Sequence, residues 1–114
     1  MLGVRRGDVV LASRDPTVGV EIRKTRPVVV VSNDIIHRLS PLVVVVPLTS
    51  SVTHLSPSHA VIPKGEGGLT AAPKVLTEQV KALDKRRLVK RLGRLDPGRI
   101  AAVDQALRNT LVLP

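Results

Sequence analysis

The sequence predicts a mainly β fold: a small antiparallel barrel, or strongly curved sheet, of about five to seven short strands closed by one C-terminal helix. Three observations lead to this prediction. Short apolar runs recur along the chain between turn residues. A 3.6-residue apolar period is found near the C-terminus. With 114 residues, the chain has the size of one hydrophobic core, so we expect a single domain over residues 1–114.

Three apolar runs, rich in β-branched residues, predict the strands of the N-terminal half. They cover residues 9–12, 28–31 and 42–46. The loop after the first run begins at Asp15-Pro16, and the second run ends at Ser32-Asn33-Asp34. The third run contains no polar residue, which favours burial on both faces of the sheet. Pro47 follows it and has no N–H for a ladder, which indicates a sheet edge or a bulge.

The C-terminal half is predicted to add three strands and a helix. The strands cover residues 60–62, 74–83 and 89–95, after a Ser-rich loop over residues 50–58. Asp84 is expected to cap a short turn through Arg87. Asp96-Pro97 is a favourable helix start, so we expect a helix from Pro97 to Val112. Its predicted buried stripe consists of Ile100, Val103, Leu107 and Leu111, with Arg99, Gln105 and Arg108 facing outward.

Composition limits the classes of function. The 18 Lys and Arg residues against 9 Asp and Glu residues give a net charge of +9, which attracts polyanions, nucleic acid first and an acidic protein second. The chain has no cysteine, which excludes disulfides, thiolate zinc sites and cysteine nucleophiles. Its apolar runs are far shorter than the roughly 20 residues that span a bilayer. We therefore expect a soluble, unexported protein of the cytoplasm.

Several segments resemble the MazF/PemK toxin family, in the same order over nearly the whole chain. In the N-terminal half they are Arg6-Gly7-Asp8-Val9, Asp15-Pro16-Thr17-Val18-Gly19-Val20-Glu21 and the segment from Lys24 to Asp34. Further along they are Val46-Pro47-Leu48-Thr49-Ser50, Pro57-Ser58-His59, Gly65-Glu66-Gly67-Gly68-Leu69, Leu76-Thr77-Glu78-Gln79-Val80, the segment from Leu83 to Leu88, and Val103-Asp104-Gln105-Ala106-Leu107.

The resemblance implies an SH3-like barrel of the MazF, PemK and CcdB type that acts as a homodimer. It implies a toxin that cuts single-stranded RNA, including mRNA, within short sequence motifs. It also implies that the reaction needs no metal or other cofactor and leaves a 2′,3′-cyclic phosphate and a 5′ hydroxyl. Translation and growth would stop until an acidic, MazE-like antitoxin blocks the toxin.

The resemblance also assigns candidate catalytic residues. Arg26 matches the family's catalytic arginine, and a planar guanidinium suits a phosphoryl group. Thr49 matches the second catalytic position, where its hydroxyl can donate to a phosphoryl oxygen. Glu21 is a candidate base or an orienter of Arg26. The RNA-binding candidates are Thr17, Lys24, Ser50, Glu78 and Gln79. The basic run Lys81 to Arg94 either tracks phosphates or is a solvated face.

Two observations leave alternatives open. The chain has no aromatic residue, so Arg planes and hydrogen bonds must replace the rings on which bases commonly stack. Its histidines, His37, His54 and His59, permit acid and base catalysis by a His pair instead. A gyrase poison of the same fold, or a non-catalytic nucleic-acid-binding module, is the alternative function, since fold alone does not separate them.

Overall fold

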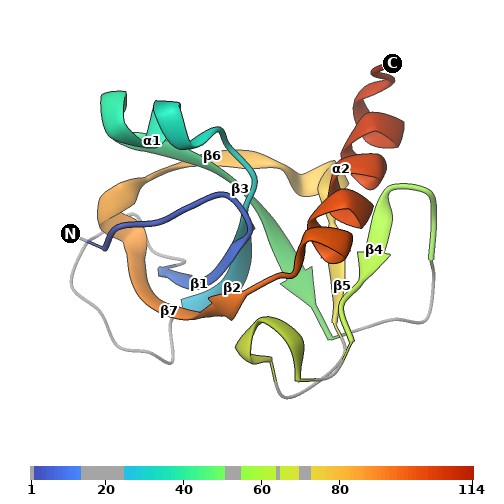
Figure 1. Ribbon diagram of the computed structural model, residues 1–114, viewed down its shortest axis with the longest axis horizontal. Helices are drawn as coiled ribbons and strands as arrows, with labels where there is room; N and C mark the ends of the chain where they lie inside the picture. Colours follow the sequence, from blue (N-terminus) through green and yellow to red (C-terminus); the bar gives the residue numbers. More distant parts are fainter. Residues whose placement is uncertain (1, 14–24, 51–54, 64, 70–72) are drawn as a thin grey trace.

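Seven β-strands and two α-helices make up the described part of the computed structural model, which comprises residues 2–13, 25–50, 55–63, 65–69 and 73–114 (Figure 1). The strands are β1 (Asp8–Ser13), β2 (Thr25–Val30), β3 (Leu42–Thr49), β4 (His59–Val61), β5 (Lys74–Leu76), β6 (Lys81–Asp84) and β7 (Leu88–Arg94). The helices are α1 (Asp34–Leu39) and α2 (Pro97–Leu111), and three short 3-10 turns are η2 (Glu66–Gly68), η3 (Thr77–Gln79) and η4 (Lys85–Arg87). The mainly β fold with a C-terminal helix is confirmed.

All strand pairs among the described residues are antiparallel, and they join the strands in the order β4-β5-β3-β2-β1-β7. Strand β3 has two partners on its second side. Its first half pairs with β6 as far as Val45, and its end pairs with β5 from Leu48 onward. Pro47 therefore lies in a central strand, at the point where β3 changes partner. A residue without an N–H is tolerated there because the ladder is interrupted.

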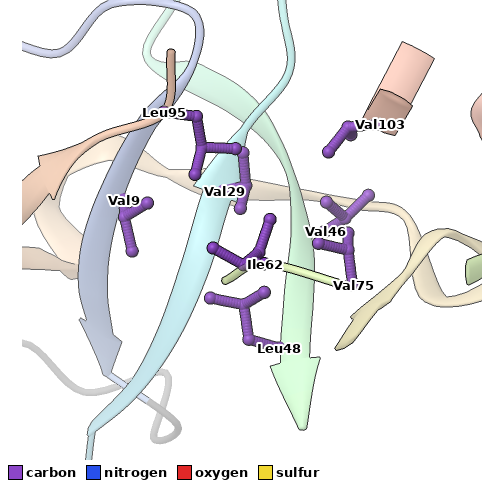
Figure 2. Packing of buried hydrophobic residues seen from close by; sticks show 8 residues of the cluster. All are labelled: Val9, Val29, Val46, Leu48, Ile62, Val75, Leu95 and Val103. Carbon is purple, nitrogen blue, oxygen red and sulfur yellow. The ribbon is translucent and has the colours of Figure 1, made fainter. Parts of the chain in front are cut away.

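The central strands bury both faces, as the unbroken apolar runs predicted. One face carries Val9, Val29 and Val46, which belong to one cluster with Leu95 and with Val103 of α2 (Figure 2). The other face forms a second cluster. It consists of Val10, Ala12, Val28, Val30, Val43, Val45, Leu83 and Leu88. Because alternate residues point to opposite faces, one short run of valines serves both clusters.

Helix α1 was not predicted. Asn33 was assigned to the end of a strand, but its side-chain oxygen accepts a hydrogen bond from the backbone N–H of Ile35 at 2.8 Å and caps the helix. The apolar side chains of α1 gave no sign of a buried face, because Ile35 and Leu39 are exposed. His37 is the buried residue of this helix.

The single strand predicted over residues 74–83 is wrong. The structure has two strands, β5 and β6, separated by the η3 turn, which the backbone N–H of Val80 closes on the carbonyl of Thr77 at 3.1 Å. Alternation of polar and apolar residues continues through such a turn, so the pattern did not mark the break. The predicted cap of η4 is confirmed, because Asp84 accepts a hydrogen bond from the N–H of Arg86 at 2.9 Å.

Helix α2 agrees with the prediction at its start. Asp96 accepts a hydrogen bond from the N–H of Arg99 at 2.8 Å, which holds the pKa of Asp96 below its usual value. The buried face of α2 agrees only in part with the predicted stripe. Val103 and Ala106 are buried, whereas Leu111, which was expected to be buried, is 50% exposed because it lies at the end of the helix.

Gly65, Gly67 and Gly68, in the turn before β5, all adopt left-handed backbone conformations, and Gly65 and Gly68 differ in what surrounds them. Gly68 has φ +75°, and a Cβ built there would lie 1.9 Å from the carbonyl oxygen of Leu92 in β7. Gly65 has φ +87° but open space around the same position. Gly68 is thus required by both backbone conformation and close approach, and Gly65 by conformation alone.

These two glycines provide a matched test of the packing of η2 on β7. Gly65→Ala should lower the free energy of unfolding by about 1 kcal/mol, the cost of a left-handed residue with a Cβ. Gly68→Ala should cost about 1 to 3 kcal/mol more, because its Cβ meets backbone that cannot move aside. Denaturant unfolding followed by far-UV circular dichroism measures both. Equal losses would show that η2 does not pack on β7 as described.

Candidate functional site

Strand pairing brings Arg26 and Thr49 together at one end of the sheet. The register pairs Val28 with Pro47 and Val29 with Val46, so its continuation by two residues places Arg26 opposite Thr49. Directly opposed residues of an antiparallel pair point to the same face. Both side chains line one pocket of 310 Å³, and its full lining is Thr25, Arg26, Pro27, Leu48, Thr49 and Ser50.

The exposure of Arg26 follows from its position in β2. Val28 and Val30, on the same face, are buried in the core, and Arg26 continues this row beyond the edge of the apolar cluster. Its guanidinium is exposed and makes no ion pair with any residue that the structure describes. A charge in this setting is available to an anion that enters the pocket.

A second pocket, of 200 Å³, also has Arg26 in its lining. It is lined by Ala12, Ser13, Arg26, Val28, Pro47, Gln79, Lys81, Leu83 and Arg87. The guanidinium of Arg87 is held in place because its Nε and Nη2 donate to the carbonyl oxygen of Ser13 at 3.1 and 2.6 Å. Three cationic side chains and one amide therefore surround a single depression, which suits a chain of phosphates with an exposed base edge.

The remaining predicted site residues divide into three groups. Ser50 lines the first pocket and Gln79 the second. Glu78 lines neither, because its carboxylate pairs with Nε2 of His59 at 3.0 Å. Thr17, Glu21 and Lys24 lie outside the described residues.

The described histidines do not line either pocket. The backbone N–H of Ser56 donates to Nδ1 of His59 at 3.2 Å, so in the neutral ring Nε2 carries the proton and donates to Glu78. His37 is buried in α1, where its Nε2 bonds to the hydroxyl of Ser32. His54 lies outside the described residues. The imidazole rings of His37 and His59 thus bond to other residues of the fold and do not lie in the pockets beside Arg26.

The basic run Lys81 to Arg94 does not form one continuous track. Lys81 and Arg87 line the second pocket. Arg91 and Arg94 each pair with Asp8, which is 1% exposed, at 3.2 Å. Two other members of the run, Lys85 and Arg86, have partners of their own. Arg86 bonds to Asp84 and thereby keeps the pKa of Asp84 below its usual value, and the ammonium group of Lys85 donates to the carbonyl of His37.

Lys81 and Arg87 line the candidate site, whereas the sequence pattern placed them in a charge run without distinguishing them from their neighbours. A sharper signal was available at Asp84. A capped turn at residues 85–87 changes the direction of the chain, so residues before and after it cannot share one face by simple alternation.

The described residues contain neither a cluster of metal-ligating side chains nor a membrane-spanning helix. No three of their His, Asp and Glu side chains gather as the ligands of a metal ion would. None of their helices is both long enough and apolar enough to cross a membrane.

The division of the basic run predicts unequal effects on stability. Arg91→Ala removes one of two guanidinium partners of the buried Asp8 carboxylate and should lower the free energy of unfolding by about 1 to 3 kcal/mol. Lys90→Ala, at the neighbouring exposed position, should stay within about 0.5 kcal/mol of the parent. Thermal unfolding of the two variants checks this. Similar losses in both would mean that Asp8 does not depend on Arg91.

The chain is similar to known toxins over almost its whole length. A family model described as PemK-like, MazF-like toxin of type II toxin–antitoxin system matches residues 5–111. Endoribonuclease EndoA of Bacillus subtilis (strain 168) is 37% identical over 111 residues, with 96% of each chain covered. Endoribonuclease MazF of Staphylococcus epidermidis is 38% identical over 111 residues, with 96% of this chain and 92% of the relative covered.

Solved structures agree with the observed fold. An endoribonuclease in complex with its cognate antitoxin, from a mycobacterial species, is 26% identical and superposes with a TM-score of 0.78, with 96% of this chain and 95% of that chain covered. A MazE-MazF structure from Deinococcus radiodurans has a TM-score of 0.79 at 20% identity, with both chains covered completely. At 20% identity, the similarity to the Deinococcus radiodurans structure shows the shared fold alone.

Proposed function

The chain belongs to the PemK-like, MazF-like toxin family of type II toxin–antitoxin systems, and from this premise we propose that it is an endoribonuclease toxin that cuts single-stranded RNA in the pocket between Arg26 and Thr49. The observation that carries the proposal is the meeting of these two side chains in one pocket at the end of the β2–β3 pair. A cationic planar group and a hydroxyl converge there on a space open to a phosphodiester.

The proposed reaction uses the RNA's own nucleophile. The 2′-hydroxyl attacks the adjacent phosphorus, the bond to the 5′ oxygen breaks, and the products are a 2′,3′-cyclic phosphate and a 5′ hydroxyl. Arg26 stabilises the charge that develops on the phosphoryl oxygens, and Thr49 donates a hydrogen bond to the same group. An arginine stays protonated in nearly every protein setting, so we assign removal of the 2′-hydroxyl proton to another group, with Glu21 as the candidate base or orienter of Arg26. The departing 5′ oxygen takes up a proton from that group or from water and becomes the 5′ hydroxyl. No step requires a metal or other cofactor.

The RNA on either side of the scissile bond is proposed to lie along the two pockets. Ser50 and Gln79 line them and can bond to base edges or sugar, and Lys81 and Arg87 can hold a neighbouring phosphate. Thr17 and Lys24 complete the proposed set from the segment that precedes β2. Glu78 belongs to it as well, although RNA that bonds to its carboxylate must compete with His59.

The proposal includes two protein partners. We propose a homodimer, because the surface carries large exposed apolar side chains of the kind that a two-fold interface buries. They are Ile35, Ile36, Leu39 and Leu42 around α1, and Leu111, Val112 and Leu113 at the C-terminus.

An acidic, MazE-like antitoxin would block the RNA pockets by charge complementarity to a chain of net charge +9. The cytoplasm, where mRNA is translated, is the proposed location.

Cleavage should depend on Arg26 and Thr49. Arg26→Ala and Thr49→Ala should each lower the rate of RNA cleavage by about a hundredfold or more, the usual effect of losing a group that stabilises transition-state charge. Lys90→Ala, which removes an exposed charge of β7 outside both pockets, is the matched control and should cleave normally. The assay incubates antitoxin-free protein with a diverse RNA pool in chelator and sequences the new 5′ ends.

Two results would contradict this assignment. One is a His59→Ala variant that loses cleavage while Arg26→Ala keeps it, which would favour histidine catalysis. The other is a parent protein that leaves every RNA whole, which would favour a gyrase poison or a passive nucleic-acid-binding module.

The salt dependence of RNA binding should distinguish a cation that lines the second pocket from an exposed cation outside both pockets. Each phosphate contact contributes about 0.7 to the slope of log affinity against log salt for a single strand. Lys81→Ala should reduce this slope by about that amount, whereas Lys90→Ala should not change it. Titrations with RNA carrying a 2′-deoxyribose at the cleavage site measure it. Equal slopes for the two variants would place the RNA elsewhere.

A further inference from the structure

The Thr77 side chain is fully buried, although it is polar. Thr77, at the start of η3, has 0% exposure. Its hydroxyl lies 2.5 Å from the carbonyl oxygen of Ser58 and 2.6 Å from the hydroxyl of Thr110 in α2. A hydroxyl has one proton, so the arrangement is satisfied when Thr77 donates to Ser58 and accepts from Thr110. A third oxygen, the carbonyl of Ala106, lies 3.3 Å away.

These bonds fix η3 to two elements that are distant in sequence. The backbone N–H of Thr77 also donates to the carbonyl of Ser58 at 3.2 Å, and the N–H of Val80 closes the turn on Thr77. Glu78, the next residue, pairs with His59 in β4. Both residues therefore hold the turn against β4 and α2. Gln79 is the residue of the turn that lines the pocket beside Arg26.

We propose that Thr77 is a positioning residue for RNA recognition, which acts by holding η3 so that the Gln79 side chain faces the second pocket. This inference rests on the proposed function, because it takes Gln79 as an RNA contact. Thr77 does not touch the substrate. Its hydroxyl matters because a three-residue turn has few hydrogen bonds of its own, so its orientation is set by the tertiary bonds of its first residue.

The partner hydroxyl on Thr110 extends the effect to α2. Thr110 lies near the C-terminal end of that helix, next to the exposed residues Leu111 and Val112. A displacement of the end of α2 would therefore change the bond that Thr77 accepts. The geometry gives the last turn of α2 a direct connection to the turn that carries Gln79.

The test compares Thr77→Val, which keeps the shape but removes the hydroxyl, with Thr77→Ser, which keeps the hydroxyl. Thr77→Val should raise KM for RNA by about three- to tenfold, which corresponds to the loss of one hydrogen bond in binding affinity. It should change kcat little. Thr77→Ser should restore KM. In a Gln79→Ala background, Thr77→Val should raise KM no further, because the side chain that it positions is gone.

A readout without RNA separates this inference from the proposed function. The chain has two Gln and two Asn residues, so its side-chain amide NMR spectrum is simple enough to assign. Thr77→Val should shift the Gln79 amide signals and leave those of Asn33 in place. Ser32→Ala, which removes another buried hydroxyl, is the matched control and should change neither KM nor the Gln79 signals.

The outcomes are distinct. A parent protein that cuts no RNA overturns the proposed function, and the Gln79 signals then still decide whether Thr77 holds the turn. Unchanged Gln79 signals in Thr77→Val, or an effect on KM that adds fully to that of Gln79→Ala, overturns the positioning role. If Thr77→Val does not fold, Thr110→Val removes the partner hydroxyl alone and should raise KM in the same direction, and an unchanged KM would overturn the proposal.

Discussion

The antiparallel pairing of β2 with β3 is the constraint on which the rest of the structure depends. Valines on both faces of these strands are buried in two different clusters. A shift of register by one residue would exchange the two faces, so double burial fixes the register strongly. Continued two residues beyond its last pair, that register brings Arg26 to the level of Thr49, and both residues line one pocket. The position of the two candidate catalytic side chains is thus a consequence of apolar packing some distance along the same strands.

The same strand explains how Gln79 reaches the site. Because β3 pairs first with β6 and then with β5, the turn that joins β5 to β6 lies beside the point where β3 changes partner. Pro47 occupies that point, and it lines the second pocket together with Gln79 and Arg26. An interruption in the ladder therefore makes room for a turn whose last residue contributes to the site. Thr77, at the other end of the turn, ties it to β4 and α2.

The strands could be predicted from sequence because their signal is local: β-branched runs between turn residues, and a capped helix at Asp96-Pro97. The features that were not predicted depend on contacts between distant residues. Thr77 bonds to residues 58 and 110, and no pattern within residues 74–83 records those bonds. Helix α1 keeps its apolar side chains outward, so burial leaves no periodic trace. In the site, Arg26 and Thr49 followed from family resemblance, whereas the separation of Glu78 from Gln79 required knowledge of His59.

The central claim is that Arg26 and Thr49 hold one scissile phosphate between them. The most direct measurement is a structure of the protein bound to an RNA whose mapped cleavage site carries a 2′-deoxyribose, which cannot react. The account predicts that the scissile phosphate lies within hydrogen-bond distance of both the Arg26 guanidinium and the Thr49 hydroxyl. A complex in which that phosphate contacts neither group, and lies instead beside His37 or His59, would contradict it.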